Sequence, residues 1–385
     1  MQIFILWILL VLVSCASLRD SPVLNQQINP YSSPLKAQYQ IIYQDNIPYL
    51  WINAPKQAIQ IGFSCYKDIR KNHLIFEYER DFRTSQYKSI RIKLEQMPPQ
   101  FWFFITLTNL ETGSKLEDAI PVFQNEDNPH TIAILDTNNQ AILQQWVTTN
   151  TRFKLQHNNP QTTHLYIKYY GDLTQPAQLP TDTFDTRVSI EDYQSVARVP
   201  IDKEIQFSEI GSYWIQSDSN SKTGLFILCS SSAFPYSIAQ TTSIDCMRYL
   251  CPEQEFQSIA TATKPQNKLR AYWANRTQKI RQKNKASKPL ISVYYNRIQK
   301  ANALFSGWQK GCLVDKGMAY IVFGPPDKVV KWAQKELWFY HSNAYRNPLE
   351  LIFHRQNNRF RLDRSAYLNL PFKKSLYNWK NGFIE

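Results

Sequence analysis

Two aspartates in the C-terminal region are placed where they could act as an acid/base pair. Asp315 and Asp327 flank the apolar run Met318–Phe323, and glycan hydrolysis uses two carboxyl groups about 5 to 9.5 Å apart. We predict a strand for this run, and at about 3.3 Å per residue a strand holds its ends well apart. We therefore favour structural roles, with Asp315 accepting backbone N–H groups in a turn and Asp327 capping the following element.

No other pattern of residues in the sequence points to catalysis or to a bound cofactor. Glycine-rich phosphate loops, the G-x-S-x-G elbow and H-E-x-x-H are absent. The six histidines are scattered, and a pair such as His341 and His354 across a sheet is more often satisfied locally than bound to metal. Asn275-Arg276-Thr277 has only the form of a glycosylation sequon. We expect no metal and no cofactor. The absence of these motifs does not exclude an enzyme.

The cysteines divide into one near the N-terminus and five in the body of the chain. Cys246 and Cys251 are close enough in sequence to form a disulfide, yet five is an odd number and no spacing resembles a disulfide scaffold or a zinc site. We interpret the five as buried free thiols with one optional bridge.

The N-terminus has the organisation of an export signal. Ile3–Val13 is an unbroken apolar run, too short for a bilayer span, and Leu12-Val13-Ser14 before Cys15 resembles the bacterial lipobox. We predict a signal peptide at 1–14, lipidation of Cys15 and a tether at 15–34. No Lys or Arg precedes the apolar run, and an ordinary signal peptide or a short inner-membrane anchor are the alternatives. The expected location is the cell envelope, at the outer membrane or its periplasmic face.

Charge is distributed unevenly along the chain. Residues 260–385 hold 24 Lys and Arg against six Asp and Glu, a balance of +18, whereas the remainder is mildly acidic at −5. Because an exported protein does not meet nucleic acid, we expect an anionic envelope partner, either lipid or protein. The residues predicted to form the partner-binding basic face are Lys283, Lys285, Lys288, Arg355, Arg359 and Arg361.

The elements that position these residues change character along the chain. Short, alternating, aromatic-rich runs between turn residues predict two Ig-like β-sandwich domains, at 35–140 and 141–258. Helical spacing then begins, in Lys268–Arg281 and Leu290–Phe305. We predict that 262–385 is a smaller α+β domain with two helices and an antiparallel sheet.

The C-terminal region resembles the bacterial GWxTD-domain family over about 211–363. Gly311-Cys312-Leu313-Val314-Asp315 aligns with the naming motif, with Cys312 in place of Trp and Val314 in place of Thr. Because Cys312 stands where the family has a packing residue, we do not favour it as a nucleophile. Gly307-Trp308 lies four residues too early for the motif. The family-motif residues, which we expect to be structural, are Gly311, Asp315, Gly317, Gly324, Pro325, Pro326, Asp327, Glu336 and Trp338.

Two hypotheses of different class follow. The resemblance implies an exported, often lipidated protein and supplies no catalytic mechanism. We favour a non-catalytic binding or scaffold subunit, anchored to membrane lipid through acylated Cys15, whose basic C-terminal domain docks other envelope proteins or anionic surfaces. The alternative is an enzyme that acts on cell-wall or surface glycan. A cleft with paired carboxylates would favour the enzyme, and a flat basic or apolar face would favour the scaffold.

Overall fold

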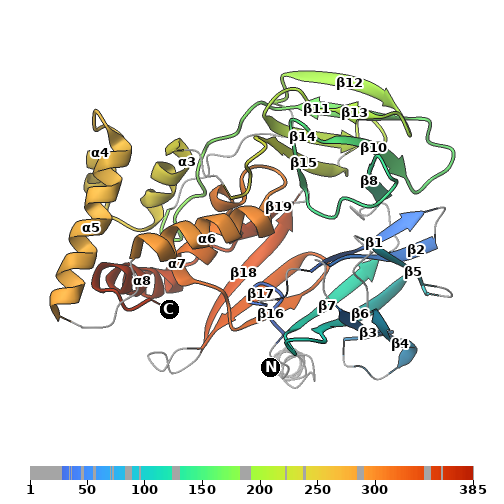
Figure 1. Cartoon of the computed structure of the whole chain (residues 1–385), viewed down its shortest axis with the longest axis horizontal. Helices are drawn as coiled ribbons and strands as arrows, with labels where there is room; N and C mark the ends of the chain where they lie inside the picture. The colour runs from blue at the N-terminus through green and yellow to red at the C-terminus, as the bar shows by residue number, and fades with distance from the viewer. Residues whose placement is uncertain are drawn as a thin grey trace, which may run out of the picture. The chain divides into compact units, whose positions relative to one another are not determined.

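The computed structural model divides the chain into two compact units (Figure 1). Unit 1 comprises Met1–Gln40, Pro48–Asn128 and Pro326–Ile352, and unit 2 comprises Ile41–Ile47, Pro129–Pro325 and Phe353–Glu385. Cys15 and the predicted signal peptide lie outside the described residues. The structure describes 28–384 except 34, 36, 45–46, 55–57, 70, 72, 83–88, 95–96, 124–130, 183–191, 222, 237–239, 284–289, 342–347 and 357–358.

Unit 1 is built on an antiparallel sheet with the order β4-β3-β6-β7. Its strands are β3 (Ile59–Tyr66), β4 (Leu74–Phe82), β6 (Gln100–Asn109) and β7 (Lys115–Phe123). Alternate residues of β3 are buried, as the period of two in a half-buried strand requires. The same unit contains β16 (Lys328–Lys331) and β17 (Lys335–Tyr340), which pair antiparallel. A separate sheet has the order β1-β2-β5, namely β1 (Gln38–Gln44), β2 (Ile47–Asn53) and β5 (Ile90–Lys93). Its residues are divided between the units, because Ile41–Ile47 belongs to unit 2.

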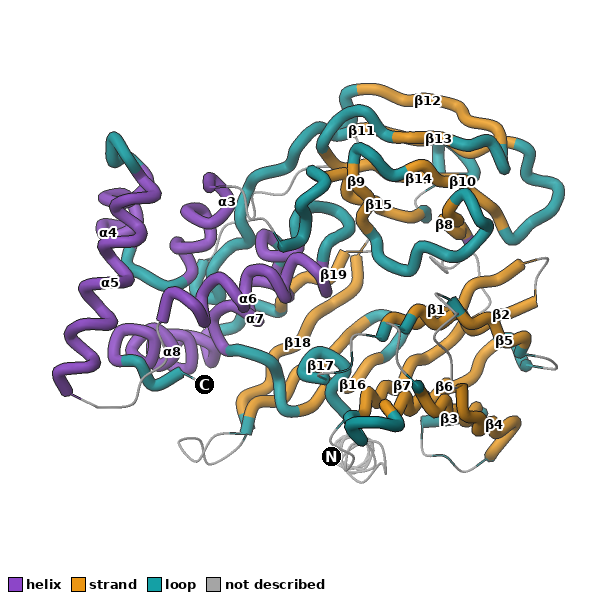
Figure 2. The backbone as a smooth tube through the Cα atoms, viewed as in Figure 1, coloured by secondary structure: helices purple, strands orange, loops and turns teal. Residues whose placement is uncertain are grey.

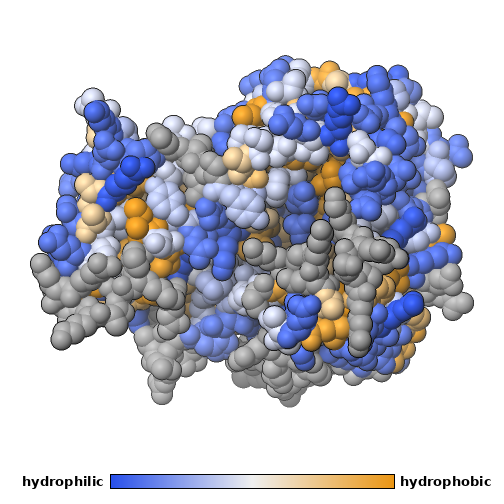
Figure 3. Space-filling view, viewed as in Figure 1, coloured by the Kyte–Doolittle hydropathy of each residue, from blue (hydrophilic) through white to orange (hydrophobic). Residues whose placement is uncertain are grey.

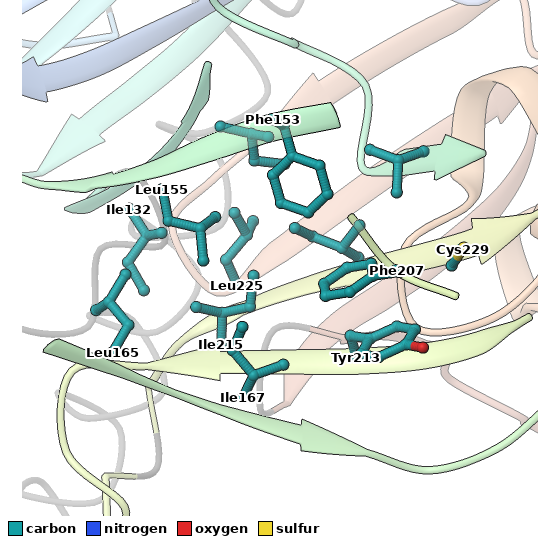
Figure 4. Close-up of a cluster of buried hydrophobic side chains, with 13 residues drawn as sticks. Ile132, Phe153, Leu155, Leu165, Ile167, Phe207, Tyr213, Ile215, Leu225 and Cys229 are labelled. Carbon is teal, nitrogen blue, oxygen red and sulfur yellow. The ribbon is translucent and has the colours of Figure 1, made fainter. Parts of the chain in front are cut away.

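The β-rich part of unit 2 consists of two sheets with a shared core. One has the order β13-β10-β8 and the other β12-β11-β14-β15-β9. Phe153 and Leu155 from the first sheet pack with Ile167, Ile215 and other residues of the second in one apolar cluster (Figure 4). The strands are β8 (Ile132–Asp136), β9 (Trp146–Thr148), β10 (Arg152–His157), β11 (His164–Tyr169), β12 (Ser195–Pro200), β13 (Ile205–Gln206), β14 (Gly211–Gln216) and β15 (Leu225–Ser230).

The remainder of unit 2 is mainly helical (Figure 2). Its strands, β19 (Arg359–Leu362) and the end of β18 (Leu349–Gln356), form a hairpin. The helices are α3 (Gln240–Asp245), η2 (Cys246–Tyr249), α4 (Glu253–Ala260), α5 (Pro265–Lys283), α6 (Leu290–Phe305), η3 (Gly311–Leu313), α7 (Asp315–Phe323), η4 (Ala366–Leu368) and α8 (Asn369–Asn381).

Two predictions about this region are corrected by the structure. It contains several helices besides the two predicted, and the predicted strand Met318–Phe323 belongs to helix α7. A short apolar run cannot be assigned to strand or helix by periodicity when it is buried on all sides, and every residue of α7 from Asp315 to Val322 is buried.

The broad fold class is confirmed: a mostly β, multi-sheet N-terminal region precedes an α+β region with several helices and an antiparallel sheet. The predicted domain boundaries remain predictions. Among the described residues, the structure reveals no helix long and apolar enough to cross a membrane.

All five cysteines in the described part of the chain are buried and free. The Cys251 thiol donates to the Met247 carbonyl oxygen at 3.2 Å, so the optional bridge to Cys246 is not formed. Burial raises the pKa of Cys65 and of Cys251 to about 12, and that of Cys229 to about 11.

We expect these five thiols to resist alkylation in the folded protein. At pH 8 the raised pKa of Cys65, Cys229 and Cys251 leaves almost no thiolate, which is the reactive form, and burial blocks access to all five. Iodoacetamide labelling followed by mass spectrometry should give little modification of the native chain and labelling at all five sites in denaturant. Rapid labelling of any one of them without denaturant would contradict the buried assignment.

Candidate functional site

The Asp315 side chain accepts three hydrogen bonds. At the first position of α7, its Oδ1 accepts a hydrogen bond from Arg364 Nη2 at 2.7 Å, and its Oδ2 accepts from Arg364 Nη1 at 3.1 Å. Oδ2 also accepts the backbone N–H of Leu362 at 2.7 Å. The side chain is 8% exposed. Asp315 therefore binds a backbone N–H, as expected of its type, but that N–H belongs to β19 and not to its own turn.

Arg364 was expected from the sequence to be a solvent-facing cation, and its pairing with Asp315 was not predicted; its side chain is only 17% exposed. Its guanidinium also donates to the carbonyl oxygens of Gln178 at 2.9 Å and Leu179 at 3.2 Å, within unit 2. Through this one side chain, the motif aspartate is connected to the segment that follows β11. The two hydrogen bonds between Arg364 and Asp315 form a bidentate arginine–carboxylate pair. Charge-assisted pairs of this kind are among the strong hydrogen bonds in proteins.

The motif glycines are explained by close backbone approach. A Cβ at Gly317 would lie 1.8 Å from the Gly311 carbonyl oxygen, and a Cβ at Gly311 would lie 2.0 Å from the Ala301 carbonyl oxygen. A positive φ does not explain the glycine at position 317. Of the motif glycines, Gly324 has a positive φ, whereas Gly311 and Gly317 do not. The helices α6 and α7 and the turn η3 are thus in near contact at these two positions.

Gly324-Pro325-Pro326 ends a helix and not the predicted strand. Gly324 closes α7 with φ +90°, and a Cβ there would lie 2.8 Å from Arg297 Nη2. Arg297 is buried and donates to the Ile321 carbonyl oxygen at 2.9 Å. The Trp379 indole of α8 donates to the neighbouring Val322 carbonyl at 3.0 Å. Side chains therefore satisfy the carbonyl groups that the end of a helix leaves open.

Glu336 and Trp338, two further motif residues, lie in unit 1. Glu336 Oε1 accepts from Trp338 Nε1 at 2.6 Å and from the Tyr31 hydroxyl at 2.7 Å, and the Tyr31 and Trp338 rings are 5.2 Å apart. Both motif side chains are buried. Burial, and then the Glu336 carboxylate, raises the pKa of Tyr31 well above its ordinary value. The tryptophan is thus a core residue whose polar atom is satisfied.

A second buried carboxylate in the same unit was missed by the sequence analysis. Asp118 on β7 pairs with Lys331 and accepts a hydrogen bond from the Tyr39 hydroxyl. Its side chain is 2% exposed, and its nearby charge raises the pKa of Tyr39 after the larger effect of burial. Asp118 and Glu336 are both committed to protein partners, so this cluster acts as a buried polar network and not as an open acid/base pair.

The proposed acid/base partner of Asp315 is also engaged elsewhere. The Asp327 carboxylate in unit 1 accepts the backbone N–H of His341 at 2.5 Å and lies 3.5 Å from its imidazole. It joins the start of β16 to the end of β17. In unit 2, His354 faces Asp363 at 3.5 Å. Among the described residues, no group of three or more His, Cys, Asp and Glu could hold a metal ion.

Cys312 and Trp308 have packing surroundings. Cys312 is fully buried, and its backbone N–H donates to Asn302 Oδ1 at 3.0 Å. Trp308, which lies outside the motif register, packs against Phe226 and Tyr170 with ring separations of 4.7 and 5.0 Å. The next basic residue, Lys310, binds Asp172 at 2.8 Å. The loop before α7 is therefore held against the β-rich part of the same unit.

The predicted basic face is only partly described. Lys285 and Lys288 lie outside the described residues, as does the side chain of Lys283. Since successive strand residues point to opposite faces, Arg359 and Arg361 share one face of the β18–β19 hairpin and Arg355 lies on the other. The Arg359 guanidinium stacks 4.1 Å from the Trp308 ring centroid. The three hairpin arginines do not form a single face.

A protein-family model matches the region that contains the motif. Residues 211–381 match the model of the GWxTD domain. The chain carries a GWxTD domain. The resemblance predicted for 211–363 is confirmed, and the GWxTD domain continues far enough to include α8. Asp315, Gly317 and the buried Glu336–Trp338 pair all lie within it. No curated protein matches the sequence.

Two solved structures with a weak likeness to this chain are a structure of PhoD and a structure of chicken CNTN1. A structure of PhoD has 8% identity and a TM-score of 0.19, and covers 32% of this chain and 23% of its own. The crystal structure of chicken CNTN1 FN1-FN3 domains has 10% identity and a TM-score of 0.19, and covers 54% of this chain and 67% of its own. The chain thus spans less than a quarter of PhoD. Neither likeness bears on function.

Proposed function

We propose that this protein is a non-catalytic binding or scaffold subunit of the bacterial cell envelope, exported and anchored to lipid through Cys15. Its basic C-terminal region docks an anionic partner. Two buried motif carboxylates favour this proposal over the glycan hydrolase: Asp315 is held by Arg364 and Glu336 by Trp338. A carboxylate that acts on substrate needs a free oxygen facing an open site.

The observation that carries the proposal is a set of helices with positive charge and no acidic residue. α5 contains six Lys and Arg, α8 contains three Lys, and neither contains Asp or Glu. Lys268, Arg270 and Lys279 of α5 are exposed. Arg276 is different, since it pairs with Glu255 of α4 at 2.7 Å. A helix end or face with unbalanced cations attracts anions over about a Debye length.

The finer architecture belongs to the same proposal. We propose that the β-rich region consists of two Ig-like sandwiches that display the GWxTD domain. The shared core between the β13-β10-β8 sheet and the β12-β11-β14-β15-β9 sheet supports one of them. The parallel pairing of β9 with β15 departs from a purely antiparallel sandwich.

We expect the reversal Lys268→Glu, Arg270→Glu and Lys279→Glu to release the partner without unfolding the domain. Partner capture would be measured by crosslinking in intact cells and by co-purification between about 50 and 500 mM salt. Because exposed charges are screened within about 8–10 Å at ordinary ionic strength, wild-type capture should fall at least about tenfold over that range.

The matched control is Lys67→Glu, Lys115→Glu and Lys203→Glu. These three exposed lysines lie outside the basic helices, so the control changes net charge equally and should keep the partner. Capture that is indifferent to salt and to both triple variants would overturn the proposed function. Equal loss in both would show a general charge effect and would overturn it as well.

A further inference from the structure

Helix α8 presents large apolar side chains on two sides. Phe372 and Trp379 are buried against the rest of unit 2, where Trp379 lies 5.7 Å from the Trp273 ring of α5. Leu370 and Tyr377 point the other way, and are 72% and 60% exposed. A surface helix is normally apolar toward the core and polar toward solvent. The outward side of α8 departs from this rule.

The outward residues recur at helical spacing and alternate with lysines. Leu370, Lys373, Tyr377 and Lys380 follow one another at intervals of three, four and three, so they share one face. Both lysines are exposed. Phe383, just after the helix, is 56% exposed and has its ring 6.4 Å from that of Tyr377. We call these five residues the α8 outer strip.

Exposed apolar residues are concentrated at this end of the chain. Of the twelve large apolar residues exposed in the described part, four lie between positions 367 and 383. On the face drawn in Figure 3, hydrophilic residues predominate over the part of the surface that is not grey, with scattered apolar residues between them. A strip that combines Leu and aromatic side chains with Lys, and has no acidic residue, is the composition of helices that lie in the interface of an anionic membrane.

We propose that the α8 outer strip docks unit 2 on an anionic lipid bilayer. Leu370, Tyr377 and Phe383 enter the boundary between headgroups and acyl chains. Lys373 and Lys380 bind lipid phosphates, with their aliphatic stems along the apolar layer. This inference rests on the proposed function in that it names the anionic partner of the basic region.

The size and shape of the strip favour lipid over a protein partner. A stable protein interface takes about 20–30 residues a side, whereas the strip is one helix wide. The buried side of α8 is already occupied by the Trp379 contacts, so the helix cannot leave its unit to fill a groove. A bilayer, by contrast, accepts a narrow strip because its surface is planar and deformable.

The test uses the full chain with a fluorophore sensitive to polarity at position 370. Leu370→Cys adds one exposed thiol to the five buried ones of the described residues, and the unsubstituted chain reports labelling at Cys15 and at the other native thiols. Vesicles of phosphatidylcholine with 30% phosphatidylglycerol are compared with phosphatidylcholine alone. We expect a blue shift and at least about a twofold rise in emission on the anionic vesicles only. In Lys373→Glu, Lys380→Glu the response should be lost.

The matched control is Leu304→Cys on α6, which is 42% exposed and lies four residues after the exposed Lys300. It should show no shift. An equal response at both positions, a response to neutral vesicles, or no response at 370 would overturn the inference. If vesicles give no response while cellular capture stays sensitive to salt and to the α5 reversal, the proposed function stands and a protein is the partner.

Discussion

Gly317→Ala is expected to prevent stable folding of the GWxTD domain. The added Cβ would lie 1.8 Å from the Gly311 carbonyl oxygen and 2.9 Å from the Cys312 Cα. Both are backbone atoms, so no side chain can rotate away, and α7 and η3 would have to separate. Overpacking that moves backbone costs about 1–3 kcal/mol and occasionally more. A 1.8 Å approach to a backbone atom belongs at the upper end of this range, which is a large part of the total stability of a protein.

Gly62→Ala is the matched control for this prediction. A Cβ there would have its nearest neighbour, the Thr106 carbonyl oxygen, at an ordinary 3.8 Å. We expect its Tm to stay within about 3 °C of wild type and that of Gly317→Ala to fall by about 10 °C or more, if folded protein is recovered. A Gly317→Ala chain with a wild-type melting curve would show that the α7–η3 approach is not as close as the structure indicates.

Local patterns predicted the elements whose burial is one-sided. Alternating runs such as Ile59–Phe63 lie in strands because every second side chain is buried, and α6 has the apolar stripe that its sequence shows. The prediction of a strand where α7 lies was wrong because burial on all sides removes the periodicity that distinguishes a helix from a strand. Motif spacing identified Asp315 and Gly317 correctly as members of the domain, but it could not give the reason for either residue.

The partners of these residues come from distant parts of the chain. Arg364 lies 49 positions from Asp315, and Tyr31 lies 305 positions from Glu336. Asp118 lies in a strand whose pattern gives no sign that a carboxylate is buried there. Pairings of this kind are set by tertiary contact, and a single sequence records no local signal for them. The sequence alone could not predict the α8 outer strip either. Recognising it requires knowing which side of the helix is already buried.

Removing the Asp315 carboxylate is expected to have the second-largest effect on stability. Breaking a buried ion pair costs about 3–5 kcal/mol when the remaining charge is left without compensation. Arg364 would keep its bonds to the Gln178 and Leu179 carbonyl oxygens, so we expect about 3 kcal/mol for Asp315→Ala. Asp315→Asn keeps an acceptor for the Leu362 N–H and should cost about 1–2 kcal/mol. Free energies of unfolding from urea titration measure both.

A double-mutant cycle separates the ion pair from the backbone contact. In Asp315→Asn combined with Arg364→Met, the two losses should fall short of additivity by about 1–3 kcal/mol, because the residues share one interaction. Asp363→Ala is the neighbouring control: Asp363 is 49% exposed and faces only His354 in the described hairpin, so its loss should cost less than about 1 kcal/mol. If the losses in free energy of unfolding at positions 315 and 364 were strictly additive, the interaction between the two side chains would contribute nothing to stability. An Asp315→Asn chain that is as stable as wild type but fails in the cell would instead assign the carboxylate a chemical role, and would reopen the hydrolase alternative.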